Sequence, residues 1–132
     1  MTVPIGKKGF MTAAQMKTLA DSGHAIGGHT WNHPKITKLE EKEWEQQIDK
    51  PRLLLEKITG KPVKYFAYPN GAWNDNAIIE LKKRGIKAAF QLTSKQSAKE
   101  PLFTIRRLMV SGSWSGTALL RMISVTFQKD KR

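Results

Sequence analysis

Two of the three histidines in this chain, His29 and His33, stand four positions apart in the stretch GGHTWNHP, residues 27–34. Neutral imidazole is the commonest metal ligand among side chains. Side chains at positions i and i+4 meet on one face if the residues between them form a helical turn. The spacing alone is a weak motif, but together with the position directly after a glycine-rich strand it predicts a metal site, and the alternative is a capping or surface role for both histidines.

The other residues near this pair limit the chemistry that it can do. Zinc proteases share the histidine spacing but need a glutamate directly after the first histidine as general base, and here Thr30 occupies that position. Because the chain has no cysteine, a metal would be held by His, Asp, Glu or water. His24 falls at the far end of the same predicted strand, so we expect it to be structural or exposed.

The elements that must position the histidines alternate between helical and strand-like patterns. Thr12 and Gln15 form a capping box that opens a helix, and Gly23 ends it. Residues 24–29 then read as a short buried strand. Apolar residues at helical spacing predict a long helix over residues 39–59, interrupted at Pro51. The remaining predicted elements are a strand over 63–68, a turn over 69–73, a helix from Asn74 or Asp75 to Arg84, a strand over 86–92, a loop over 93–101, a strand over 102–110 and a helix over 117–127.

This alternation predicts an α/β fold with parallel strands and crossover helices. Four candidate strands are few for a closed (β/α) barrel, so a partial barrel is expected. In such folds the chemistry collects where strands lead into loops. Three segments fall at that edge and form one candidate site: residues 27–34, 67–73 (AYPNGAW) and 110–116 (VSGSWSG).

In this order, the motifs resemble those of the polysaccharide deacetylases of carbohydrate esterase family 4, over nearly the whole chain. Residues 11–39 resemble the family's second motif region, which contains H-[ST]-x-x-[HN]-H. Residues 58–90 resemble the third motif region with its following helix and strand, and residues 103–112 (FTIRRLMVSG) resemble a late strand. The ordered combination is far more specific than any one motif.

The resemblance implies an irregular (β/α) barrel that hydrolyses acetyl groups from N- or O-acetylated polysaccharides such as chitin, peptidoglycan or poly-N-acetylglucosamine. It implies a divalent metal, most often zinc, held by His29 and His33. It also implies an extracellular or cell-wall location, although no signal peptide precedes the motifs in this chain.

Family members take the third metal ligand and the general base from two aspartates on an early strand. The aspartates here are Asp21, Asp49, Asp75 and Asp130, and none stands next to another acid. We therefore expect residues 1–132 to be a single deacetylase-like domain that lacks the N-terminal strands. Such a chain should be weakly active or inactive unless another segment supplies the acids.

Two further departures concern the reacting groups. The family's R-x-P-Y motif is here Ala67 to Asn70, but the backbone N–H of Asn70 can still serve as an oxyanion donor, because it does not depend on a side chain. No histidine follows His33 to act as the late general acid. Arg107 matches an arginine that such sequences often carry; it orients a carboxylate or is simply a solvated strand-end residue.

Aromatic residues at the loop edge are candidates for binding sugar. Trp31, Tyr68 and Trp73 could stack on sugar rings, and the alternative is that each covers the core. Trp114 is a weaker candidate, and Trp44 fits the buried stripe of the long helix.

The net charge of +12 allows a second class of function, a non-catalytic module that binds glycan or a polyanion on the same fold. The lysines are spread along the chain and only KDKR at the end is dense, which favours a solvated basic surface. No nucleic-acid motif is present, so nucleic acid is not expected as a partner. No apolar run is long enough to span a membrane, and the oligomeric state is not predicted.

Overall fold

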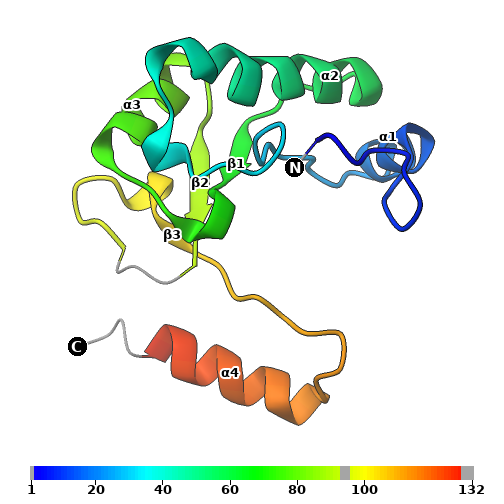
Figure 1. The fold of residues 1–132 in the computed structure, drawn as a ribbon. Helices are drawn as coiled ribbons and strands as arrows, with labels where there is room; N and C mark the ends of the chain where they lie inside the picture. The colour runs from blue at the N-terminus through cyan, green and yellow to red at the C-terminus, as the bar shows by residue number, and fades with distance from the viewer. Residues whose placement is uncertain (1, 93–95, 129–132) are drawn as a thin grey trace.

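The structure is a computed structural model that describes residues 2–92 and 96–128. Within these residues a parallel sheet has the strand order β1 (Tyr65–Ala67), β2 (Ala88–Gln91) and β3 (Ile105–Arg106) (Figure 1). Phe66 pairs with Ala89, and Phe90 pairs with Ile105. The α/β class with parallel strands is confirmed, and the described strands form an open sheet rather than a closed barrel.

The strand predicted over residues 24–29 is reduced to one bridge, in which Gly28 pairs with Phe66. The Gly28 N–H donates to the Tyr65 oxygen over 2.8 Å, and the Ala67 N–H donates to the Gly28 oxygen over 2.9 Å. A Cβ at Gly27 would lie 3.0 Å from the Tyr65 oxygen. The glycines therefore let this segment approach β1 closely and bring His29 to the end of β1.

Local capping signals place two helices as predicted. Helix α1 (Ala13–Asp21) begins with the capping box, in which the Gln15 N–H donates to the Thr12 hydroxyl over 3.2 Å. Helix α3 (Asp75–Lys83) is capped by Asn74, whose side-chain oxygen accepts from the Ala77 N–H over 2.8 Å. Asn74, and not Asp75, is therefore the cap.

The helix predicted over residues 39–59 begins later than expected. Short 3₁₀ turns at Ile36–Lys38 and Glu41–Glu43 are followed by a π-helical turn at Glu45–Asp49, and α2 covers only Lys50–Thr59. In a regular α-helix the ring of Pro51 would crowd the carbonyl of the residue four positions earlier, Gln47. The wider π-turn relieves this contact, so Pro51 does interrupt the helix, one turn before the proline itself.

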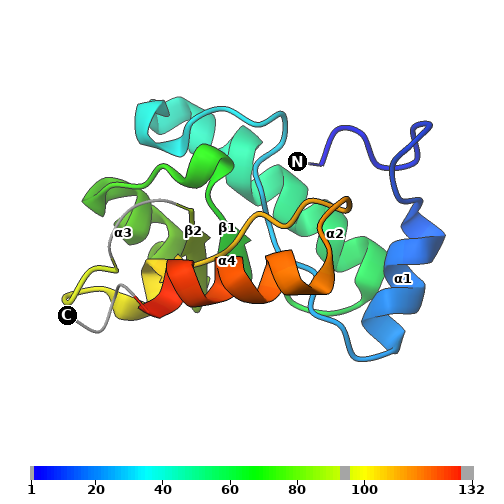
Figure 2. The same ribbon diagram turned by 90° about the horizontal axis from the view of Figure 1, so that it is seen from below.

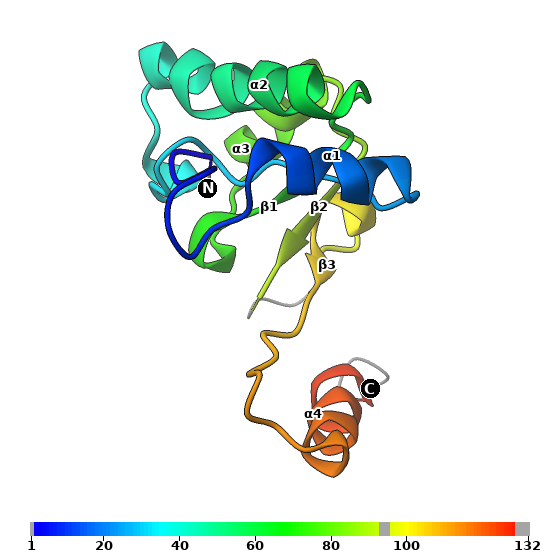
Figure 3. The same cartoon turned by 90° about the vertical axis from the view of Figure 1, so that its right-hand side faces the viewer.

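The end of the chain departs most from the prediction. Of the strand expected over residues 102–110, only Ile105–Arg106 pairs, and a 3₁₀ turn at Pro101–Phe103 precedes it. Helix α4 (Gly116–Gln128) forms close to the predicted bounds. It stands apart from the sheet and the other helices (Figures 1 and 3), and in the view from below it lies in front of them (Figure 2). None of the helices that the structure describes is long and apolar enough to cross a membrane.

The core lies between α2, α3 and one face of the sheet. Trp44 is buried as predicted, and the cluster that contains it comprises Ile36, Trp44, Ile48, Leu55, Val63, Phe66, Tyr68, Ala77, Ile78, Leu81, Ile86, Ala89 and Phe103. Tyr65, Ala67 and Phe90 alternate with core residues along β1 and β2, so they line the opposite face. That face carries a cavity of about 480 Å³, and His29 is part of its wall.

A charged cluster fixes α3 to the π-turn. The Arg84 guanidinium donates to Asp49 over 3.0 Å and also to the buried Glu80 carboxylate. Lys83 donates to the same carboxylate over 2.6 Å. Because Asp49 ends the π-turn and Arg84 caps α3, this cluster holds the two helical segments in register.

The hydrogen bonds from Lys83 and Arg84 hold the pKa of Glu80 below its usual value, even though burial alone would raise it. A lowered pKa in the folded state means that folding is stabilised above the unfolded pKa and loses this stabilisation as the pH falls through the folded pKa. We expect the free energy of unfolding to fall more steeply in the wild type than in Glu80→Gln as the pH drops from about 5 towards 3. Urea unfolding across this range measures the difference, with the same change at the exposed Glu41 as control. Parallel pH profiles for wild type and Glu80→Gln would contradict the assignment.

Candidate metal centre

The structure brings the two predicted histidines together. The ring centres of His29 and His33 lie 4.9 Å apart, and the rings are inclined at 68°. Two imidazoles bound to one zinc at about 2.0–2.1 Å in tetrahedral geometry would hold their ring centres roughly 5 Å apart. The observed separation therefore fits two ligands of one ion.

One ring nitrogen of His29 forms a hydrogen bond with the backbone. Its Nδ1 lies 2.6 Å from the Ala67 oxygen, and because a carbonyl can only accept, Nδ1 carries the proton. This leaves the Nε2 lone pair for a metal, and a second hydrogen bond of this kind usually orients a histidine ligand. Burial lowers the pKa of His29 to about 4, with smaller contributions from His33 and Arg107, against the opposing effect of the Ala67 bond. The ring is therefore neutral at pH 7, the form that binds metal.

The loop between the histidines is not the helical turn that their spacing suggested. Thr30 and His33 have φ of 62° and 74°, which is unusual for residues other than glycine, above all for a β-branched one. The buried Thr30 hydroxyl donates to the His29 oxygen over 2.6 Å and accepts from the His33 N–H over 3.0 Å. A bend tied by this hydroxyl, rather than a helix, places the two rings together.

Consecutive carbonyls at the end of β1 hold two candidate site residues. The Ala67 oxygen accepts from His29, and the Tyr68 oxygen accepts from the Arg107 Nη2 over 3.2 Å. The half-buried Arg107 has a pKa lowered by burial. Its Nε is also buried and has no hydrogen-bond partner within the described residues. A guanidinium in this position is suited to pairing with an anionic group near His29.

Asn70 follows directly in the 3₁₀ turn Pro69–Gly71 and has φ of 56°. It is exposed and lies two residues beyond the carbonyl that holds Arg107. Its backbone N–H as oxyanion donor stays a prediction.

The three aromatic residues predicted to contact sugar have different environments in the structure. Trp31 is half-buried, and the Lys50 ammonium lies 4.1 Å from its ring centre. Trp73 is half-buried and packs against the core. Tyr68 is 0% exposed, and its hydroxyl donates to the Phe103 oxygen over 2.9 Å. Burial raises the pKa of Tyr68. Tyr68 is therefore a core residue, which corrects the expectation that its ring contacts sugar.

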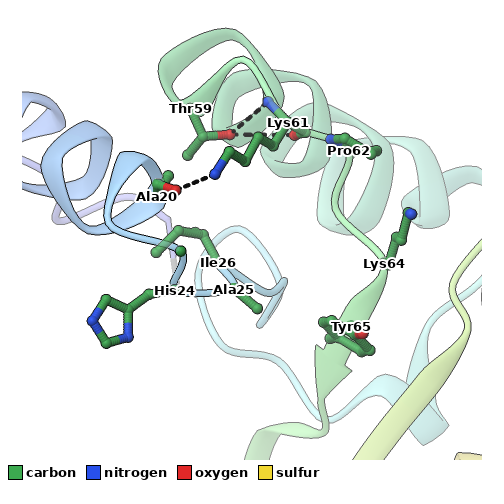
Figure 4. A pocket seen from close by; sticks show the side chains of 10 residues that line it. Ala20, His24, Ala25, Ile26, Thr59, Lys61, Pro62, Lys64 and Tyr65 are labelled. Atoms are coloured by element: carbon green, nitrogen blue, oxygen red, sulfur yellow. Dashed lines mark hydrogen bonds between the residues drawn. The ribbon is translucent and has the colours of Figure 1, made fainter.

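His24 is exposed and lies away from His29 and His33, as expected. It lines a cavity of about 240 Å³ at the end of α1, together with Lys61 and Lys64 (Figure 4). The Lys61 ammonium donates to the Ala20 oxygen in the last turn of α1.

Within residues 2–92 and 96–128 no three His, Cys, Asp or Glu residues are grouped so that they could hold a metal ion. The centre therefore fits a metal in part, with two imidazole ligands but no neighbouring carboxylate in the described ranges. No signal in the sequence pointed to two of the groups that contact His29 or the loop between the histidines, the Ala67 carbonyl and the side chain of Gln47. Backbone carbonyls leave no trace in residue types, and Gln47 meets the loop across 15 or more positions of sequence.

The chain is similar to known polysaccharide deacetylases. Residues 3–89 match the family described as "Polysaccharide deacetylase". The chain is 35% identical over 63 residues to a peptidoglycan-N-acetylglucosamine deacetylase of Bacillus cereus, a match that covers 48% of this chain and 23% of that protein. It is 38% identical over 66 residues to a chitooligosaccharide deacetylase of Azorhizobium caulinodans, covering 49% and 31%. A solved polysaccharide deacetylase structure from Bacillus cereus matches with a TM-score of 0.75 at 26% identity, over 92% of this chain and 39% of that one. The matches thus span less than half of each of these proteins.

Proposed function

This chain belongs to the polysaccharide deacetylase family, and we propose that it serves metal-assisted hydrolysis of acetyl groups on a polysaccharide. The observation that carries the proposal is the His29–His33 pair, with ring centres 4.9 Å apart and with the Nδ1 of His29 on the Ala67 carbonyl. Imidazole ligands suit zinc, copper, iron and nickel, and among these the resemblance to the family points to zinc.

When bound, such an ion polarises the acetyl carbonyl and lowers the pKa of a water molecule. The residues of this chain supply binding and orientation. His29 and His33 would hold the ion through imidazole nitrogens, and the N–H of Asn70 would donate to the acetyl oxygen as negative charge develops on it. Arg107, fixed on the Tyr68 carbonyl, orients a carboxylate beside His29.

The proposed substrate is an acetylated glycan of the cell wall, either chitin-like, peptidoglycan or poly-N-acetylglucosamine. Two of the similar proteins are named as deacetylases of peptidoglycan and of chitooligosaccharide. Trp31 and Trp73 are half-buried aromatic residues of the loop edge that retain exposed surface for a sugar ring, and the weaker candidate Trp114 is half-buried as well. A substrate of this kind implies an extracellular or cell-wall location.

The proposed chemistry also needs a general base and a third metal ligand. Since no aspartate pair accompanies the histidines in the described ranges, we propose that a carboxylate from elsewhere completes the centre. Without it, turnover by this chain is weak. A glycan-binding or polyanion-binding module without catalysis is the second candidate, favoured by the two-ligand centre and the charge of +12.

Acetate release from an N-acetylglucosamine oligomer, measured with zinc and with added formate, tests these proposals. We expect slight release with zinc alone and more release with formate, because a small carboxylate can supply a missing ligand or base. The release should disappear in His33→Ala. Fast turnover without formate would refute the proposal that this chain lacks a carboxylate needed for catalysis.

Zinc-independent oligomer binding without acetate release under any of these conditions would favour the binding module. The salt dependence of that binding then identifies its ligand. Binding of a polyanion weakens steeply with salt, whereas stacking on a neutral sugar does not.

A further inference from the structure

Gln47 contacts the loop between the two histidines from the helical side. Its side chain is 6% exposed, and its Oε1 accepts from the N–H of Trp31 over 3.2 Å and from the N–H of Asn32 over 3.4 Å. One amide oxygen thus satisfies two successive backbone donors at the centre of the bend. Neither the proposed ligands nor the proposed substrate contacts account for this buried side chain.

The bend needs such support because its backbone is unfavourable by itself. Thr30 and His33 both have positive φ, and they flank the two residues that Gln47 contacts. Residues held in sparsely populated φ/ψ regions persist only where the surrounding structure over-determines them. Without its partners, the loop would relax and the two rings would separate.

The loop is held on its carbonyl side by a different segment. The Thr2 hydroxyl donates to the Thr30 oxygen over 3.1 Å, and the N–H groups of Thr2 and Val3 donate to the Trp31 oxygen. Gln47 supplies the complementary contact to the N–H groups. The two sets of bonds clamp the bend from opposite sides.

The position of Gln47 is itself fixed by its surroundings. It lies in the π-turn Glu45–Asp49, next to the buried Ile48, and Asp49 of the same turn accepts from Arg84 of the α3 cap. Pro51 accounts for the wide turn, because its ring would otherwise crowd the Gln47 carbonyl. The acceptor is therefore presented to the loop by a rigid element, as accurate ligand placement requires.

We propose that Gln47 is a positioning residue of the metal centre, which sets the separation of His29 and His33 by holding the two N–H groups between them. The inference rests on the proposed function in that the ion is taken to bind between these two histidines. Gln47 touches neither the ion nor the substrate and acts only through the loop.

The test compares zinc binding by three variants of the whole chain with that of the wild type, using isothermal titration calorimetry. Gln47→Met keeps the length of the side chain and removes the acceptor, and we expect it to raise the zinc dissociation constant about tenfold or more. Gln47→Glu restores an acceptor oxygen and should bind nearly as the wild type does. Gln46→Met, the same change at the neighbouring exposed residue, should have no effect.

Amide hydrogen exchange adds a readout that does not depend on the metal. Exchange at Trp31 and Asn32 should accelerate in Gln47→Met and stay slow in Gln47→Glu. If Gln47→Met loses stability against urea but keeps the wild-type zinc affinity, Gln47 is merely structural and the proposal is overturned. Should that variant not fold, Gln47→Asn, which shortens the reach and keeps the amide, must weaken zinc binding in its place.

A failure of the proposed function would be seen in the wild type and not only in the Gln47 variants. If the wild-type chain binds no zinc, the metal role of the histidines fails. Gln47 is then judged by the nuclear Overhauser contact between the His29 and His33 rings, which Gln47→Met should abolish. An unchanged ring contact would overturn the positioning role as well.

Discussion

Replacing either His29 or His33 with alanine is expected to raise the zinc dissociation constant of this chain about 100-fold or more. The described residues offer these two imidazoles and no third side-chain ligand near them. Each substitution therefore removes half of the protein ligands in the described ranges. Loss of a group that merely orients a ligand already costs about 10–100-fold, so loss of the ligand itself should exceed that range.

Calorimetric titration with zinc measures this effect, and His24→Ala is the matched control. His24 is exposed and lines a different cavity, so its loss should leave the affinity unchanged. An equal weakening in all three variants would mean that the chain binds zinc non-specifically. Unchanged affinity in His29→Ala and in His33→Ala would remove both residues from the metal centre.

The two histidine variants are expected to differ in folding stability, which allows a loss of zinc binding to be distinguished from unfolding. His29 holds the Ala67 carbonyl through Nδ1, so His29→Ala leaves that acceptor at the end of β1 without the ring and should lose stability against urea. The His33 ring contacts the His29 ring, and its backbone is bound to Thr30. A loss of zinc affinity in His33→Ala without a matching loss of stability therefore separates ligation from folding.

Local signals in the sequence predicted local structure well. The Thr12–Gln15 capping box appears as expected, and Asn74 is the one of the two candidate caps that the structure selects, because each cap depends on residues three positions apart. Strand pairing was harder to predict, since it depends on a distant partner. Residues 102–110 have a strand-like composition, yet only Ile105–Arg106 pairs with β2 as a strand, and the Arg107 N–H adds one hydrogen bond to the Gln91 oxygen.

The candidate site was also predicted only in part, because the residue types are visible in the sequence but the backbone conformation between them is not. His29 and His33 were identified from type and spacing, but a bend with positive φ, and not a helical turn, joins them. Tyr68 shows how strand parity decides between surface and core. Side chains alternate along a strand, and Tyr68 shares the parity of Phe66, whose ring it meets with centres 5.7 Å apart. Its place in the core follows from that register rather than from its nearness to the loop edge.

Gly71→Ala is expected to reduce the free energy of unfolding by about 2–5 kcal/mol. Gly71 has φ of +70°, and a Cβ there would lie 2.6 Å from the backbone nitrogen of Leu92. Left-handed backbone costs a residue with a Cβ about 1–2 kcal/mol. The clash adds to this cost, because Leu92 directly follows β2 and its backbone cannot move without disturbing the strand.

Gly60→Ala separates these two contributions. Gly60 has the same φ of +70°, at the end of α2, but nothing lies within 4 Å of a Cβ placed there. It should therefore lose only about 1–2 kcal/mol, and urea unfolding of both variants measures the difference. Equal losses would show that backbone conformation alone makes glycine necessary at Gly71.

A larger loss for Gly71→Ala would mean that close packing of the Pro69–Gly71 turn on Leu92 holds this loop in place. That turn carries Asn70, and it begins directly after Tyr68, whose carbonyl holds Arg107. The same contact would then position the proposed oxyanion donor and the proposed carboxylate-binding arginine relative to His29. Zinc affinity should change little in Gly71→Ala, because both imidazoles lie on a different loop.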